Sequence, residues 1–154
     1  APAFIDRVHA LFARLLTLPV PTVAAVNGHA FGAGSMLAMA HDWRVMRTDR
    51  GYFCFPEVDI QIPFTPGMTA LIQAKVSPRT AIDAMTTGRR FGGPEAVTLG
   101  LVDADVPADE LLAAAIARVG DLTDKHPHTL GAIKSAMYAD VVERLGLTAV
   151  ATAA

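Results

Sequence analysis

Apolar side chains at the start of the chain recur at helical spacing. Over residues 3–17 they return every three or four positions between polar ones, which predicts an amphipathic helix that two prolines end. The apolar, β-branched run 22–26 predicts a buried strand closed by a turn. Glycines over 28–34 then lead into Ser35–Ala40, a run rich in good helix formers. The pattern thus predicts a strand joined to a helix N-terminus by a glycine segment.

Farther along, short strands give way to helices. Strands are expected over 43–46 and 52–55, and a Thr-Pro pair predicts a helix from Thr65 to about Val76, with Thr65 as its N-cap. The remaining expected elements are helices over 78–87 and 94–99, a strand at 101–102, and helices over 108–122 and 129–145. Strands dominate the first half and helices the second, which predicts an α/β fold without an internal linker or repeat.

Composition narrows the class of partner. The chain has 154 residues, of which 52% are apolar and 18% charged, enough for a substantial core. Lys and Arg total 13 against 15 Asp and Glu, and the net charge of -2 gives no long-range attraction for a nucleic-acid backbone. We therefore expect no nucleic-acid partner. Cys54 is the only cysteine and the first residues carry no targeting pattern, so we expect a cytoplasmic protein.

Membrane and metal sites are both disfavoured by the sequence. The stretch Val20–Ala40 is apolar enough for a membrane span, but Pro21, Asn27 and His29 would interrupt a helix there or make it polar. We expect no membrane association. The five histidines are scattered without ligand spacing, so we expect no metal site.

The glycine segment Gly28–Gly34 has two interpretations. Small residues before a helix let backbone N–H groups converge on an anion or a polarised carbonyl, and they equally allow close packing of strand on helix. A P-loop is excluded because no lysine precedes Lys75. A nucleophile elbow is excluded because it needs glycine two residues before and after the serine, and Ser35 has Ala33 and Leu37 there. The dinucleotide-binding fingerprint matches at Gly32 and Gly34, but Leu37 stands where its third small residue should be. A dinucleotide-binding oxidoreductase is therefore a weaker alternative.

Glu57 differs from the other acidic residues in its surroundings. It lies in the apolar, aromatic segment Tyr52–Phe64, where a carboxylate loses hydration and its pKa rises. A base with a pKa near neutrality is what proton abstraction beside a carbonyl requires. The other interpretation is an exposed charge at a strand end beside Asp59. Glu57 is therefore the candidate general base.

Three blocks in a fixed order carry a resemblance to a known family. They are Leu18–Gly34, Met36–Asp42 with Phe55–Asp59, and Thr87–Asp103. Over about residues 15–147 the chain resembles the crotonase (enoyl-CoA hydratase/isomerase) superfamily, and within it the plant Δ3-Δ2-enoyl-CoA isomerases. The resemblance implies a crotonase-like spiral of strand-strand-helix turns followed by a helical C-terminal region. It divides the chain into 1–105, the C-terminal part of the core, and 106–154, a helical region that packs subunits into a homotrimer or hexamer.

The resemblance also implies roles for single residues. Glu57 would be the base, and the backbone N–H of Ala33 would hold the thioester oxygen of an acyl-CoA. Hydratases have a second glutamate where this chain has Met36, and a thioether cannot activate water, so an isomerase is favoured. The substrate-binding residues expected from position are Phe31, Gly32, Gly34, Pro56, Ile62 and Phe64. Coenzyme A is part of the substrate, so no separate cofactor is expected.

Two further features qualify this likeness. Ser35 resembles the nucleophile of the related Clp proteases, but Asp59 stands near where their histidine base would be, so nucleophilic catalysis lacks a partner. The family's preceding strands, which provide a second oxyanion N–H, are absent from the sequence, and we expect them to precede Ala1. The expected reaction is the shift of a 3-enoyl-CoA to a 2-enoyl-CoA. A hydratase-like or non-catalytic homologue remains an alternative.

Overall fold

Two strand-strand-helix units follow one another along the chain and stack in parallel. The computed structural model describes residues 2–147. The units are β1 (Val23–Val26), β2 (Ala30–Phe31) and α2 (Ala33–Met39), then β3 (Trp43–Arg47), β4 (Phe53–Cys54) and α3 (Glu57–Ile60). Strand β1 pairs in parallel with β3, and β2 pairs in parallel with β4. This stacking is the spiral that the resemblance implies.

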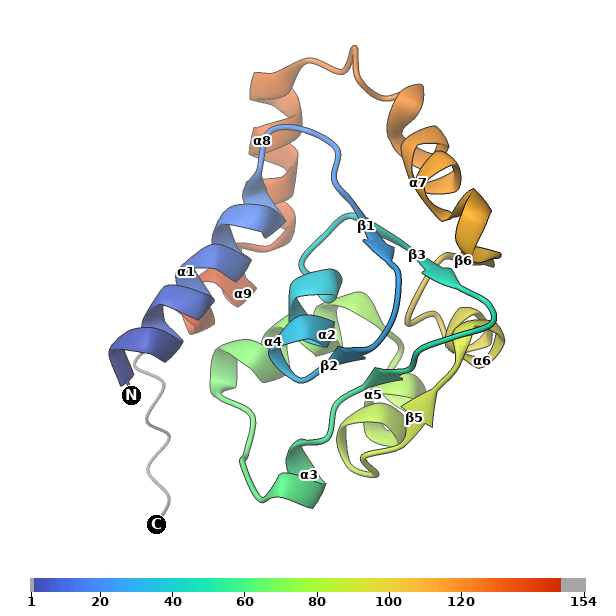
Figure 1. Cartoon of the computed structure of the whole chain (residues 1–154). Helices are drawn as coiled ribbons and strands as arrows, with labels where there is room; N and C mark the ends of the chain where they lie inside the picture. The colour runs from blue at the N-terminus through green and yellow to red at the C-terminus, as the bar shows by residue number, and fades with distance from the viewer. Residues whose placement is uncertain (1, 148–154) are drawn as a thin grey trace.

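The strands form two three-stranded sheets that lie between the helices (Figure 1). In the first sheet β3 lies between β1 and β6 (Ala104–Val106), all parallel. In the second, β4 lies between β2 and β5 (Arg90–Phe91), and β5 runs antiparallel to β4. Helix α7 (Leu111–Gly120) packs against β1 and β3, and α2 packs against β2 and α4 (Pro66–Lys75). Helix α2 thus lies in the interior, with its N-terminus beside the second sheet.

The core is built from the inward faces of α2, β3 and β4. Phe53 and Phe55 are fully buried and their rings meet edge to face, with centroids 5.8 Å apart. Met36 and Met39 of α2 are buried in the same cluster. A fully buried side chain of this size contributes roughly 1.5–3 kcal/mol, so this cluster holds α2 in place.

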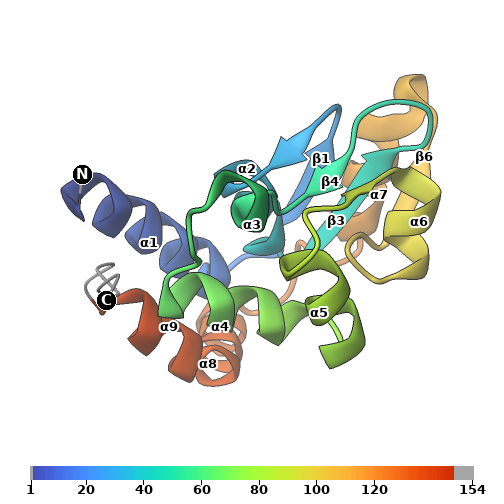
Figure 2. The ribbon, with the colours of Figure 1, turned by 90° about the horizontal axis from the view of Figure 1, so that it is seen from below.

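The first helix and the last two described helices lie together at one side of the molecule (Figure 2). Helix α1 (Pro2–Thr17) packs against α8 (Pro127–Met137) and α9 (Ala139–Leu145), and α9 also packs against α4. The other helices are α5 (Pro78–Met85), α6 (Gly93–Thr98) and the short η1 (Ala108–Glu110). No helix within residues 2–147 has the length and apolarity of a membrane span. The division at 105/106 and the oligomerisation role of the second part stay predictions.

Two element predictions are wrong. The strand expected at 101–102 instead lies at 104–106, as β6. Leu101 and Val102 are apolar because they are buried in the core after Gly100, which has a positive φ. The helix expected over 129–145 is two helices that meet at Tyr138. The short elements β2, β5 and α3 were not predicted, because two to four residues carry no measurable periodicity.

His9 joins three helices inside this packing. Its ring is 1% exposed, with Nδ1 3.0 Å from the Leu145 carbonyl oxygen and Nε2 2.9 Å from Thr65 Oγ. Thr65 is the predicted N-cap of α4, and its Oγ accepts from the Met68 N–H. His9 therefore links α1 to the start of α4 and the end of α9.

Replacing this histidine is expected to destabilise the fold. In His9→Leu, the Thr65 hydroxyl and the Leu145 carbonyl each lose a partner, which costs roughly 1–3 kcal/mol of unfolding free energy. Urea denaturation measures the loss. The exposed His128 gives the control, because His128→Leu is expected to change stability by less than about 0.5 kcal/mol. Equal effects of the two substitutions would contradict the linking role.

Candidate active site

Glu57 is a buried carboxylate with one oxygen that accepts no hydrogen bond from the described residues. The residue is 7% exposed, and its Oε1 has no hydrogen-bond partner among the described residues. Burial raises the pKa of the Glu57 carboxyl above its ordinary value, and a hydrogen bond to its own backbone has a smaller, opposite effect. A buried polar group left unpaired is costly, and such groups are found at functional sites more often than elsewhere. Glu57 therefore has the environment of a general base.

A single helical turn fixes the backbone of Glu57. Helix α3 begins at Glu57, directly after Pro56, and ends at Ile60. Its C-cap, Gln61, has a φ of 58°, a left-handed conformation uncommon outside glycine. The Ile62 N–H then donates to the Glu57 carbonyl oxygen at 3.1 Å. This closed turn holds the start of α3 against the glycine segment.

The glycine segment faces the carboxylate through Gly32. Gly32 has a φ of 56°, and a Cβ added to it would lie 3.5 Å from Glu57 Oε2. The next residue, Ala33, is the first residue of α2, so its N–H has no acceptor within the helix, and the residue is exposed. Gly32, which lies close to the carboxylate, is thus followed directly by an exposed residue whose N–H has no acceptor within the helix.

The Ser35 hydroxyl is engaged in the fold. Ser35 is fully buried, and its Oγ donates toward the carbonyl oxygens of Gly32 at 2.7 Å and Cys54 at 2.9 Å. These contacts tie α2 to β4. The carboxylate of Asp59 lies instead against Gly88. The geometry does not support Ser35 as a nucleophile, which agrees with the missing base in the sequence.

A cavity of about 450 Å³ opens beside Glu57, a volume typical of small-molecule sites. It is lined by Glu57, Val58, Gln61, Ile62, Pro63, Phe64, Thr69 and Met85. Ile62 and Phe64, two of the residues predicted to bind substrate, thus share a cavity with the candidate base. The other predicted site residues do not line it, and their roles stay predictions: Phe31, Gly32, Ala33, Gly34 and Pro56.

The sequence left five of the cavity's residues unassigned, namely Val58, Gln61, Pro63, Thr69 and Met85. Val58 could have been found from its place directly after Glu57. Thr69 and Met85 come from α4 and α5, and no local pattern brings these helices to α3. Met36 does not line the cavity; it is 2% exposed and belongs to the core. The position of the hydratases' second glutamate therefore offers neither a carboxylate nor an exposed side chain. Within residues 2–147 no three His, Cys, Asp or Glu side chains gather as a metal site.

Comparison with known proteins places the chain in a family. Residues 3–153 match the family model described as enoyl-CoA hydratase/isomerase. The chain belongs to this family. The peroxisomal enoyl-CoA delta isomerase 2 of Arabidopsis thaliana is 39% identical over 140 residues, which are 88% of this chain and 58% of that protein. A probable enoyl-CoA hydratase of Mycobacterium tuberculosis is 39% identical over 126 residues, 82% of this chain and 48% of that protein.

Solved structures of this enoyl-CoA hydratase/isomerase family share the fold. Human mitochondrial delta3-delta2-enoyl-CoA isomerase superposes with a TM-score of 0.85 at 24% identity, over 94% of this chain and 58% of that one. The predicted crotonase fold is therefore confirmed. The chain spans less than two thirds of the length of these relatives. One relative is peroxisomal by name, and the cytoplasmic location of this protein stays a prediction.

Proposed function

We propose that the protein is an acyl-CoA double-bond isomerase that shifts a 3-enoyl-CoA to the conjugated 2-enoyl-CoA with one carboxylate. The observation that carries the proposal is Glu57, which is buried, has a raised pKa and pairs with no cation among residues 2–147. Its Oε2 lies close to Gly32, and the exposed Ala33 follows Gly32 directly. This adjacency supports Ala33 as the oxyanion donor, although Ala33 does not line the cavity beside Glu57.

The proposed reaction is a proton transfer between two carbons. The Glu57 carboxylate takes a proton from C2 of the thioester, and the C–H electron pair moves toward the carbonyl oxygen to give a dienolate. The Ala33 N–H donates to that oxygen as its charge grows. The protonated Glu57 then returns the proton at C4, the double bond forms between C2 and C3, and the thioester carbonyl is restored. A raised pKa suits a group that must both accept and release a proton near neutrality.

The cavity beside Glu57 suits an acyl chain. Val58, Ile62 and Met85 give it apolar walls, and Phe64 is held by edge contact with the buried Phe55, with centroids 6.2 Å apart. Apolar walls keep bulk water from the dienolate and help to keep the carboxyl pKa high. The substrate class proposed from this lining is an aliphatic enoyl thioester.

The isomerase is favoured over the hydratase by the absence of a second carboxylate. Adding water across a double bond needs one group to activate the water and another to protonate C2, whereas Met36 is a buried thioether. Relatives named for both reactions are equally similar to the chain, at 39% identity each. The choice between the reactions therefore rests on the site residues.

Ligand-dependent stability separates this proposal from its alternatives. We expect a saturated acyl-CoA to raise the melting temperature, because a ligand at about 100 times its Kd stabilises the folded state by about 2.7 kcal/mol. Free coenzyme A is the control for the acyl part, and NAD probes the dinucleotide alternative. A shift with NAD alone would support an oxidoreductase and contradict the proposal. No shift with any acyl-CoA would support a non-catalytic homologue.

A further inference from the structure

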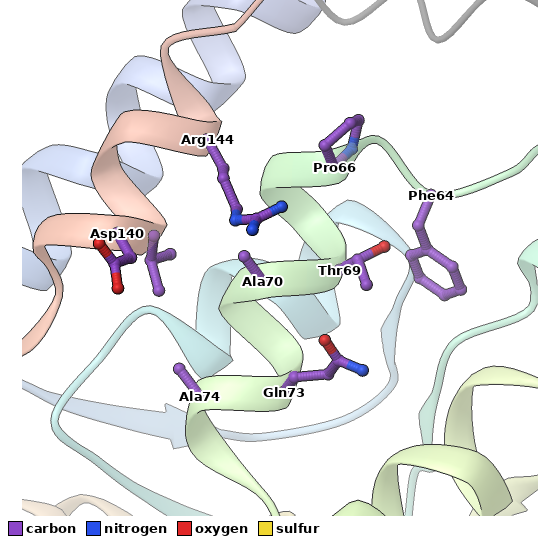
Figure 3. Close-up of a pocket in the computed structure, with 9 residues that line it drawn as sticks. Phe64, Pro66, Thr69, Ala70, Gln73, Ala74, Asp140 and Arg144 are labelled. Carbon is purple, nitrogen blue, oxygen red and sulfur yellow. The ribbon is translucent and has the colours of Figure 1, made fainter.

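The cavity beside Glu57 borders a second hollow between α4 and α9. This groove has a volume of about 610 Å³ and shares Phe64 and Thr69 with the Glu57 cavity (Figure 3). Pro66, Ala70 and Ala74 give it an apolar floor along α4. At 1.5 Å per residue the floor is roughly 12 Å long. An acyl chain that passes Phe64 therefore meets a groove that accommodates its distal part.

The walls of this groove are polar. Figure 3 shows Arg144 reaching from α9 toward α4, while Thr69 and Gln73 extend from α4 on the side of Phe64. Among residues 2–147 Arg144 makes no ion pair, and Asp140, one turn earlier in α9, does not reach it. A guanidinium without a carboxylate partner has five N–H donors in a planar fork that suits a carboxylate. The groove thus combines an apolar floor with a guanidinium that pairs with no carboxylate among residues 2–147.

A third hollow offers a contrast on the other side of Phe64. It has a volume of about 300 Å³ and shares Phe64 with both neighbours. Its lining is mostly apolar, with Pro78, Ala81 and Ile82, and its polar residues, Gln73 and Thr86, are uncharged. Phe64 therefore borders all three hollows, and a charged chain end is favoured in the one that contains Arg144.

We propose that the groove between α4 and α9, which Gln73 also lines, is a subsite for an acyl chain that ends in a carboxylate bound by Arg144. The substrate class is the CoA thioester of a dicarboxylic acid. The inference rests on the proposed function, since the thioester end must lie at Glu57. Arg144 then selects between substrates by their distal ends and takes no part in proton transfer.

Binding of unreactive probes tests the subsite without requiring turnover. Calorimetric titration compares saturated acyl-CoAs of matched length that end in a carboxylate or a methyl group. Arg144→Met is expected to weaken binding of the carboxylate probe roughly tenfold or more, the usual effect of removing a hydrogen bond to a charged group. The affinity for the methyl probe is expected to change by no more than about twofold. Gln73→Leu should show the same selectivity with a smaller effect. Arg79→Met is the matched control, because Arg79 is exposed on α5 and pairs with Asp83.

Each outcome decides between named explanations. Equal weakening of both probes by Arg144→Met would place Arg144 at the coenzyme A moiety or in the fold and overturn the subsite. Tighter binding of the methyl probe by the unmodified protein would overturn it as well. Carboxylate selectivity in a protein that does not isomerise 3-enoyl-CoA would overturn the proposed function and leave the subsite standing. Failure to bind either probe would overturn both.

Discussion

Glu57→Gln is expected to lower the rate of isomerisation by on the order of 10² to 10⁴, the usual effect of removing a general base. The amide keeps the shape of the side chain and loses the proton acceptor. No cation pairs with Glu57 among the described residues, so the substitution breaks no ion pair. Folding and acyl-CoA binding are therefore expected to persist. The measurement is the growth of absorbance of the conjugated 2-enoyl thioester, with a 3-enoyl-CoA as substrate.

The neighbouring carboxylate gives the matched control. Asp59 lies two residues after Glu57 in the same helical turn, but it is exposed and rests against Gly88. Asp59→Asn removes the same charge from the same element and is expected to leave most of the activity. A loss smaller than tenfold in Glu57→Gln, or an equal loss in Asp59→Asn, would assign the base to another residue.

Ala33→Pro is expected to lower turnover by roughly 10² to 10³, the effect of losing one oxyanion donor. Proline removes the N–H, yet it is tolerated at the first position of a helix, where that N–H has no helical acceptor. Ala33 occupies this position in α2. The substitution therefore deletes the donor and leaves the hydrogen bonds of the helix in place.

Ala33→Gly separates the donor from the side chain. Glycine keeps the N–H and removes only a methyl group, so most of the turnover is expected to remain. Steady-state rates of the two variants with one 3-enoyl-CoA, together with their circular dichroism spectra, make the comparison. Similar rates in two folded variants would exclude the Ala33 N–H as a donor.

Local sequence signals predicted the elements that carry this site. The β-branched run before the glycines forms β1, and the Thr-Pro pair at Thr65 begins α4. Both were predictable because a strand run and a helix cap are determined by neighbouring residues in the sequence. The burial of Glu57 also followed from its apolar neighbours. Gly32 adopts a positive φ and lies close to Glu57 Oε2, while an oxyanion-binding role of the glycine segment stays a prediction.

The shape of the site depends on contacts that no local pattern contains. Helix α3 is one turn long, and its end at Gln61 requires a left-handed residue that is not glycine, so no periodicity or glycine signal marked it. Thr69 and Met85 meet Glu57 only because α4 and α5 pack beside α3. Arg144 joins the same region from the last helix of the described chain. Such residues follow from the tertiary arrangement of the family fold.

One carboxylate, Glu57, is proposed to make the protein an isomerase and to leave it a poor hydratase. The most direct test gives one preparation a 3-enoyl-CoA and, separately, the 2-enoyl-CoA of the same length. Absorbance of the conjugated thioester rises in the first reaction and falls in the second if water is added. With Met36 in place of a second carboxylate, isomerisation is expected to exceed hydration by a wide margin. Hydration faster than isomerisation would contradict the single-carboxylate mechanism.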